Sequence, residues 1–250
     1  MHPEKFAFES QICKETPLFS LIIPIRNEAN IIVTSLNVLR KSLKSEKYEL
    51  IIFDDCSQDG TYNKLRDVIA SFTNPDMLLM HSTFRVGKGA SIKESIGRAM
   101  GEMVLIMDVD LSADLASIPK LLKDARDSGG LVIGQRSITD RFSQGVLRVM
   151  LSLGYNLLVR LLFQTGISDH QCGFKAMKTD VARKLMRNIE SDGFVFDTEL
   201  IVAARKSGLP VRQTRVKWTD NRPRKSNFKW IMTSITMIRD LLNVRKAYGG

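Results

Sequence analysis

Two aspartates separated by a single residue, Asp108 and Asp110, form a pair whose spacing could do chemistry. Two neighbouring carboxylates both stay charged only if a cation lies close to them. Magnesium ions in proteins are often held by one or two carboxylates together with the phosphates of a substrate. The pair therefore predicts a metal–diphosphate site, and the alternative is a solvated loop in which the two acids occur by chance.

A second acidic cluster occupies residues 54–61 and reads Asp-Asp-Cys-Ser-Gln-Asp-Gly-Thr. Carboxylates in such a cluster can accept hydrogen bonds from a nucleobase imide or from ribose hydroxyls. Asp59 or Ser57 could instead cap a helix that begins near Gly60. Both roles fit, with one aspartate for a ligand and another for the cap.

Apolar and amphipathic stretches alternate along the chain, and they determine where these acids lie. We predict strands at residues 18–25, 48–53, 77–80, 103–107, 131–134 and 211–218, the first of which is a continuous apolar run. We predict helices at residues 28–43, 60–72, 88–100, 146–163, 196–206 and 230–245. The alternation indicates an α/β fold with a mostly parallel, doubly wound sheet.

Ligands of such sheets bind beyond the carboxyl ends of the strands. Three of the predicted strands are followed there by polar residues, namely Asn27-Glu28, Asp54-Asp55 and Asp108-Val109-Asp110. We therefore expect the three clusters to belong to one site.

The chain carries a net charge of +10, which favours an anionic partner such as a nucleic acid, a phosphorylated small molecule or an anionic membrane. Nucleic acid is not expected, because the sequence has no zinc-finger spacing, RRM signature or defensible helix-turn-helix pattern. The three cysteines, Cys13, Cys56 and Cys172, form no Cys-x-x-Cys pair, so neither a zinc site nor a disulfide framework is expected. This cysteine usage favours a reduced, cytoplasmic compartment, and the first residues lack the apolar core of a signal peptide.

Two predicted helices, 146–163 and 230–245, combine many apolar side chains with flanking cations, as interfacial helices do. The first contains Arg160 and is too short to cross a bilayer, which takes about 20 apolar residues. We therefore expect a peripheral protein at the cytoplasmic face of a membrane. Packing of these helices on the sheet, or a homodimer interface, is the alternative, and the oligomeric state stays open.

The motifs together resemble those of the inverting GT-A glycosyltransferases of the polyprenyl-phosphate (dolichyl-phosphate) hexose synthase type. The resemblance covers residues 19–245 and rests on the order and spacing of its segments. The matching segments are residues 23–28, 54–61, 87–89, 108–112, 134–136, 169–175 and 196–200, with Arg148 and Ser152. The segment Asp-x-Gln-Cys-Gly-Phe-Lys at 169–175 is more similar to the dolichyl-phosphate glucosyltransferase branch than to the mannosyltransferase branch.

This resemblance implies transfer of a hexose from a nucleotide sugar to a polyprenyl or dolichyl phosphate, with inversion at C1 and with Mg²⁺ or Mn²⁺ as cofactor. UDP-glucose or a related UDP-sugar is the favoured donor. GDP-mannose as donor and a sugar hydroxyl as acceptor are the alternatives. A phosphate monoester is already anionic near pH 7, since its second pKa is about 6, so cations that position it matter more than a carboxylate base.

The resemblance also assigns roles to residues. It implies nucleotide contacts by Pro24, Arg26, Glu28, Asp55 and Asp108, metal contacts by Asp108, Asp110 and Ser112, and acceptor-phosphate contacts by Arg136, Arg148, Ser152 and Arg222. Asp108, Asp110 and Arg136 are then the catalytic residues, while Asp197 and Glu199 could line the acceptor side or could cap a helix. The expected domains are an N-terminal extension at 1–17, a GT-A catalytic domain at 18–218, and a basic loop with an amphipathic helix at 219–250.

Overall fold

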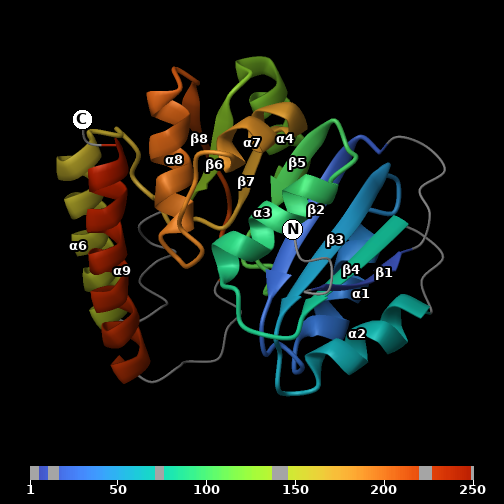
Figure 1. Cartoon of the computed structure of the whole chain (residues 1–250). Coiled ribbons are helices and arrows are strands. Elements are labelled where there is room, and N and C mark those ends of the chain that lie inside the picture. The colour runs from blue at the N-terminus through green and yellow to red at the C-terminus, as the bar shows by residue number, and fades with distance from the viewer. Residues whose placement is uncertain (1–5, 11–16, 71–75, 137–145, 220–226, 249–250) are drawn as a thin grey trace.

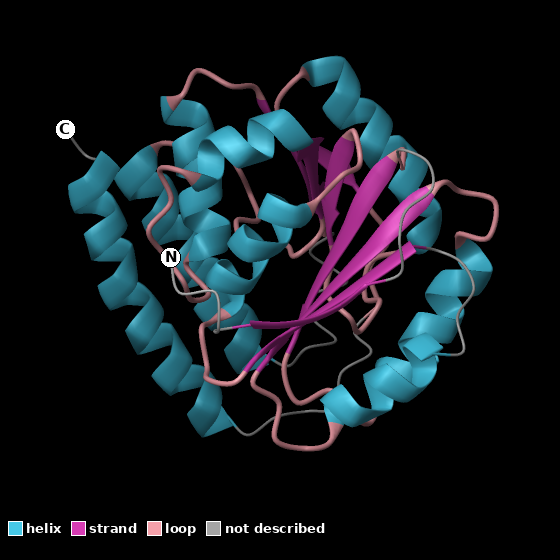
Figure 2. Ribbon diagram, turned by 45° about the vertical axis from the view of Figure 1, so that its right-hand side comes forward, coloured by secondary structure: helices cyan, strands magenta, loops and turns pink. Residues whose placement is uncertain are grey.

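The protein is represented by a computed structural model that describes residues 6–10, 17–70, 76–136, 146–219 and 227–248. Helices cover both faces of a central sheet (Figures 1 and 2). The helices are α1 (Ile32–Ser42), α2 (Thr61–Ala70), α3 (Lys88–Arg98), α4 (Ile118–Ser128), α6 (Val146–Phe163), α7 (Thr179–Met186), α8 (Phe196–Lys206) and α9 (Asn227–Tyr248), with a short 3₁₀ turn, η2 (Leu115–Ser117).

The sheet contains eight strands within the described residues, in the order β1-β4-β3-β2-β5-β7-β6-β8. The strands are β1 (Phe6–Ser10), β2 (Phe19–Ile25), β3 (Tyr48–Asp55), β4 (Asp76–Ser82), β5 (Met103–Ile106), β6 (Leu131–Gln135), β7 (Lys175–Lys178) and β8 (Val211–Arg215). Strands β4, β3, β2 and β5 are parallel, as are β6 and β8, whereas β1 and β7 run antiparallel to their neighbours. The expected α/β class with a mostly parallel sheet is confirmed.

Burial explains why the central strands read as continuous apolar runs. All eight residues of β3 are buried, and in β2 only Pro24 is partly exposed. A strand covered by helices on both faces must be apolar on both sides, so the usual alternation disappears. Leu21 of β2 lies beside Leu50 of β3 and Leu105 of β5, at the centre of the main core.

Strand β1 joins the sheet although the sequence does not predict a strand there. It lies within the segment taken as an N-terminal extension, yet all five of its residues pair with β4. Three further elements were not expected, namely α4, β7 and α7. Strand β7 escapes prediction because it has four residues, two of them lysines, although Lys175 is fully buried.

Helices α6 and α9 lie side by side at one end of the molecule (Figure 1). They form a second, smaller core with the residue that precedes α8; its buried members are Tyr155, Val159, Val195, Met237, Leu241 and Val244. The last helix of the chain therefore packs mainly on α6. Within the described residues, no helix combines the length and the apolar character that crossing a membrane would need.

Candidate functional site

The strand order brings the three acidic and polar clusters together. Strands β3, β2 and β5 are neighbours and parallel, so their carboxyl ends meet at one edge of the sheet. Asp54 and Asp55 are the last two residues of β3, and Asn27-Glu28 and Asp108 to Asp110 lie just beyond the ends of β2 and β5. A ligand at this edge would contact all three loops.

The loops after β2 and β3 are held together by hydrogen bonds from the backbone of one to side chains of the other. The Glu28 amide donates to Thr61 Oγ1 at 2.9 Å, and the Ala29 amide donates to Asp59 Oδ2 at 3.0 Å. Asp59 also accepts from the Thr61 amide at 3.1 Å, which makes it the residue that caps α2. Burial works against the charge of Asp59, but these hydrogen bonds outweigh it and hold its pKa below the usual value.

Asp55, expected at the nucleotide, holds the loop that leads into α3. Its Oδ1 accepts from the Val86 amide at 2.6 Å and its Oδ2 accepts from the Gly87 amide at 3.0 Å. Each carboxylate oxygen has a second lone pair, so a contact between Asp55 and a nucleotide stays a prediction. Pro24 is half-buried within β2, and the side chains of Arg26 and Glu28 reach solvent at its end.

The two glycines at 87 and 89 are explained by a close approach of backbones. A Cβ atom at Gly87 would lie 2.3 Å from the Asp192 carbonyl oxygen, and one at Gly89 would lie 2.4 Å from that of Ser191. The Gly89 amide donates to the Asp192 carbonyl at 2.7 Å. The first turn of α3 is thus fixed against the segment before α8, and it carries Lys88 between the two glycines.

Lys88 belongs to a series of four alternating charges, here called the ion-pair chain, that runs from the core to the site. The Lys175 Nζ lies 2.7 Å from Asp197 Oδ1, and Lys88 Nζ lies 2.9 Å from Asp197 Oδ2. Lys88 Nζ also lies 3.4 Å from Asp108 Oδ1. The Lys175 side chain is fully buried, whereas that of Asp108 is 24% exposed, so the ion-pair chain begins in the core and ends at the surface of the site.

Asp110 is almost fully buried, and a tight turn fixes it. Its Oδ1 accepts from the Ser112 amide at 3.0 Å, and Leu111 between them has a positive φ of 50°. The Ser112 carbonyl accepts from the Thr219 amide at 2.8 Å. These two bonds fix the backbone of Ser112, whose side chain is buried.

The donor set at Asp108 and Asp110 suits a hard divalent cation. Two carboxylates supply oxygen ligands of the kind that Mg²⁺ and Mn²⁺ prefer, and substrate phosphates can supply others. No group of three or more His, Cys, Asp or Glu side chains that could hold a metal occurs in the described part of the chain. Gly173 makes room for Asp108, because a Cβ atom there would lie 2.3 Å from Asp108 Oδ2.

The residues expected at an acceptor phosphate are only partly described. Arg136 donates to both oxygens of Asp169, at 2.6 and 2.8 Å, and its guanidinium lies 5.1 Å from the ring centre of Trp218. Burial opposes its charge, but the bonds and charge of Asp169 raise the pKa of Arg136 above its usual range, so it stays cationic. Ser152 is half-buried on α6, whereas the Arg148 side chain and Arg222 lie outside the described residues.

A buried polar network ties α6 to the loop that carries Asp169. The amide oxygen of Asn156 accepts from the His170 backbone at 2.9 Å and lies 2.7 Å from His170 Nδ1, while Nε2 lies 2.6 Å from Thr165 Oγ1. An amide oxygen can only accept, so Nδ1 carries the proton and the Thr165 hydroxyl donates to Nε2. Burial lowers the pKa of His170 to about 4, which keeps it neutral near pH 7.

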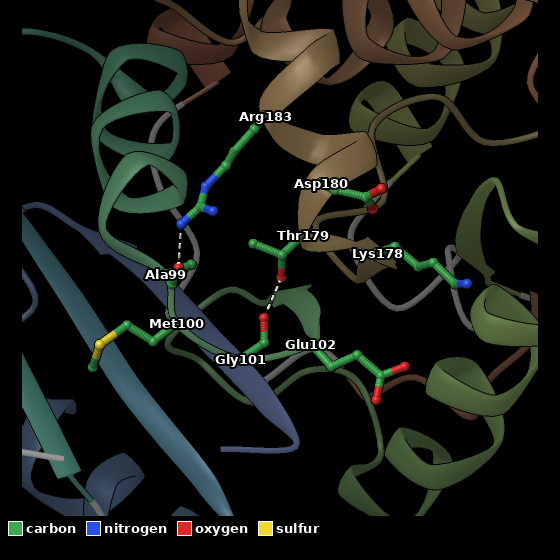
Figure 3. Close-up of a pocket in the computed structure, with 8 residues that line it drawn as sticks. All are labelled: Ala99, Met100, Gly101, Glu102, Lys178, Thr179, Asp180 and Arg183. Carbon is green, nitrogen blue, oxygen red and sulfur yellow. Dashed lines mark hydrogen bonds between the residues drawn. The ribbon is translucent and has the colours of Figure 1, made fainter. Parts of the chain in front are cut away.

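Figure 3 shows a surface hollow of about 610 Å³ beside the residues that precede β5, whereas Asp108 follows the other end of that strand. Its lining residues are Ala99, Met100, Gly101, Glu102, Lys178, Thr179, Asp180 and Arg183. Arg183 donates to the Ala99 carbonyl at 2.6 Å and Thr179 donates to the Gly101 carbonyl at 2.5 Å. These bonds join α7 to the start of β5, and nothing in the hollow belongs to the acidic site.

Comparison with known proteins adds a family, a relative and two solved structures. The model of the family described as "Glycosyl transferase family 2" matches residues 20–186. The dolichyl-phosphate beta-glucosyltransferase of Dictyostelium discoideum is 28% identical over 264 residues, which cover 98% of this chain and 80% of that protein.

Both solved structures are similar in fold. The mannosyl-3-phosphoglycerate synthase of Rubrobacter xylanophilus has a TM-score of 0.70 at 15% identity and covers 93% of this chain and 75% of its own. The glucosyl-3-phosphoglycerate synthase of Mycobacterium tuberculosis, in complex with Mn²⁺, UDP-glucose and phosphoglyceric acid, has a TM-score of 0.66 at 18% identity, with coverages of 91% and 79%.

Proposed function

Because this chain belongs to glycosyl transferase family 2, we propose that it transfers a hexose from a nucleotide sugar to a polyprenyl or dolichyl phosphate, with inversion at C1. The observation that carries the proposal is the position of Asp108 and Asp110 at the carboxyl end of β5, beside the loops after β2 and β3. The similarity to a dolichyl-phosphate beta-glucosyltransferase over nearly the whole chain supports a UDP-sugar as donor and a lipid phosphate as acceptor.

Asp108 and Asp110 would hold Mg²⁺ or Mn²⁺ with the donor diphosphate. The ion, when bound, would neutralise the diphosphate as it leaves. The Mn²⁺ in the complex of the mycobacterial synthase supports a divalent cofactor. The Ser112 amide donates to Asp110 Oδ1 at 3.0 Å and so helps to hold that carboxylate in place.

The surroundings of Asp197 favour an anionic acceptor. A sugar hydroxyl would need a general base within hydrogen-bond reach, but both carboxylate oxygens of Asp197 are bonded to lysines. Both oxygens of Glu199 accept backbone amides, those of Glu190 and Ser191. A phosphate acceptor needs no base, so this arrangement supports the lipid-phosphate proposal.

Arg136 is suited to position such a phosphate. Its bonds to Asp169 use one N–H of Nε and one of a terminal nitrogen, whereas a guanidinium has five donors in a rigid fork. The charge of Asp108 contributes to the raised pKa of Arg136, which supports a common site for the two residues. Arg148, Ser152 and Arg222 would extend the phosphate site along α6 and the segment before α9.

A polyprenyl acceptor lies in a membrane, so the enzyme must reach the headgroup level, and we assign that contact to α6 and α9. Their outward faces carry large exposed apolar side chains, here called the apolar stripe. Its members are Met150, Leu153, Leu157 and Leu161 on α6 and Ile238 and Leu242 on α9. The net charge of +10 would add attraction to an anionic cytoplasmic leaflet. We therefore propose a peripheral protein at the cytoplasmic face.

The test is a donor screen read by product mass. The purified chain is incubated with a short polyprenyl phosphate, Mg²⁺ or Mn²⁺, and UDP-glucose, other UDP-sugars or GDP-mannose in turn. We expect a polyprenyl-phosphate hexose from a UDP-sugar, and at least about a hundredfold loss in Asp110→Asn.

Asp114→Asn is the matched control, because the Asp114 side chain caps η2 by accepting from the Ala116 amide, and asparagine caps equally well. A product formed only from GDP-mannose would show that the donor is GDP-mannose and not a UDP-sugar. Transfer only to sugar hydroxyls, or full activity of Asp110→Asn in EDTA, would refute the proposal.

A further inference from the structure

The ammonium group of Lys88 occupies a position where it competes with a metal ion. It lies 2.9 Å from Asp197 Oδ2 and 3.4 Å from Asp108 Oδ1, which is one of the two proposed metal ligands. The two lysines and two aspartates of the ion-pair chain balance in charge, so Asp110 contributes one further negative charge to the site. Without a ligand, the carboxylate pair is thus already half neutralised by a cation of the protein.

Lys88 is held in this position from three sides. Its backbone lies between Gly87 and Gly89, which both contact the backbone of residues 191–192 with no room for a Cβ atom. Asp55 fixes the two amides before it. Asp197 holds the ammonium itself and is in turn bonded to the fully buried Lys175. The ammonium can therefore not withdraw far when a second cation arrives.

A divalent cation at Asp108 and Asp110 would lie within a few ångströms of this ammonium, and like charges at such a distance in a partly buried site repel strongly. The diphosphate of a nucleotide brings two or more negative charges, which offset both cations. Metal and nucleotide must then strengthen each other's binding, because coupling between two ligands is reciprocal.

We propose that Lys88 is a built-in counter-ion that keeps divalent cations weakly bound at Asp108 and Asp110 until a nucleoside diphosphate arrives. The inference rests on the proposed function, since it takes these aspartates as the metal site. It goes further because it makes the order in which metal and nucleotide bind depend on one lysine. The site then takes up metal together with its donor.

The experiment measures Mn²⁺ affinity by calorimetry, with and without saturating UDP, in four proteins. Lys88→Gln removes the charge and leaves Asp197 paired with Lys175, so the fold should persist; Lys88→Met is a second charge-free variant. Lys88→Arg keeps the charge. Lys93→Gln is the matched control, because Lys93 lies on the same helix but pairs with Asp192 at 2.5 Å.

We expect Lys88→Gln to bind Mn²⁺ alone about tenfold more tightly than the wild type, and to bind UDP alone more weakly. The factor by which UDP strengthens Mn²⁺ binding should fall by a similar amount. Lys88→Arg and Lys93→Gln should behave as the wild type. A merely structural role for Lys88 would not change the two affinities in opposite directions.

Three outcomes are distinguishable. If UDP promotes Mn²⁺ binding equally in the wild type and both charge-free variants, and Mn²⁺ alone binds them no more tightly, the inference is wrong while the metal site stands. If no protein binds Mn²⁺ even with UDP, the inference and the metal-dependent function fail together. Tighter binding of Mn²⁺ alone in Lys88→Gln and Lys88→Met, and not in Lys93→Gln, would support the inference.

Discussion

At residue 173, beside Asp108, the structure has no room for any side chain. A Cβ atom at residue 173 would lie 2.3 Å from a carboxylate oxygen of Asp108, a distance that no real pair of atoms tolerates. The glycine thus sets the orientation of a proposed metal ligand although it is not a ligand itself. A misplaced ligand can reduce the rate of a reaction by about a hundredfold.

Gly173→Ala should therefore lower kcat/KM for sugar transfer by about a hundredfold, with a small change in melting temperature, because residue 173 does not adopt a positive φ. Steady-state kinetics and thermal unfolding measure the two effects. Gly97→Ala is the control, since Gly97 lies on α3 with nothing within 4 Å, and it should gain roughly 0.5–1 kcal/mol of stability. Unchanged kinetics in Gly173→Ala would contradict the assigned contact.

His170 should make the protein sensitive to mild acid. Its folded pKa of about 4 lies below the unfolded value of about 6.5, so the neutral form stabilises the fold above pH 6.5 and this contribution is lost as the pH falls toward 4. Linkage gives a loss of about 2 kcal/mol between pH 7.5 and 5.0.

Urea unfolding of the wild type and of His170→Gln at both pH values checks this. Groups that titrate in both proteins cancel in the comparison, so the wild type should lose about 2 kcal/mol more than the variant. An equal loss in the two proteins would show that His170 does not carry the effect.

The paired acids at 108 and 110 could be found from the sequence, because they follow a buried strand directly in the chain. The pairing of Lys88 with Asp197 could not, since it joins residues 109 positions apart and depends on two loops meeting. The same holds for Asp55, whose place at a strand end was predicted but whose bonds to the amides of residues 86 and 87 were not. Spacing along the chain reveals neighbours on one element and not contacts between elements.

Among the elements, the pair α6 and α9 has a core of its own. Leu241 is fully buried in it, whereas the adjacent Leu242 is 51% exposed. Periodicity predicted α6 with the bounds that the structure shows, since its apolar residues outnumber the other kinds. It gave no sign of the partner, which is 64 residues further along the chain.

Leu241→Ala should destabilise this helix pair by about 2–5 kcal/mol through the cavity that it leaves. Amide hydrogen exchange should accelerate in α6 and α9 and stay slow in β2 and β3, which belong to the main core. Leu242→Ala, the neighbouring substitution, should change stability by no more than about 0.5 kcal/mol. Uniform acceleration throughout the sheet would mean that the two cores unfold as one.

On the scale of the whole molecule, the positive net charge and the apolar stripe are the two features that would favour binding to an anionic membrane. Helices α6 and α9 form one end of the molecule, and α1 and α2 lie at the other (Figure 1). The resemblance drawn from the motifs is confirmed at the level of the family, since the family model matches residues 20–186. Orientation toward a lipid surface depends on which side chains remain exposed after folding, which the sequence does not reveal.

Flotation with anionic vesicles tests the membrane contact. We expect binding that weakens as salt is raised, since each basic residue near the surface adds about 1 kcal/mol that salt screens. Leu161→Glu should weaken it further, because Leu161 is 71% exposed within the apolar stripe. Val38→Glu is the control, because it makes the same charge change on α1, where Val38 is 42% exposed. It should weaken vesicle binding only by the small electrostatic effect of one added negative charge. If the protein is a dimer that does not float with vesicles at any salt concentration, peripheral docking is excluded.

The position of the antiparallel strand β7 has a consequence for folding while the protein is being synthesised. It lies between β5 and β6 and joins them, yet it is synthesised after both and after the whole of α6. A nascent chain that ends near residue 163 contains β6 without either of its neighbours, β7 or β8, and β5 with one open edge. Strand β6 therefore stays without a partner while the ribosome adds the 43 residues from 136 to 178, which takes about two to nine seconds. The lysine-rich, four-residue strand β7 then covers the open edge of β5 and gives β6 its first partner, while the other edge of β6 stays open until β8 is made.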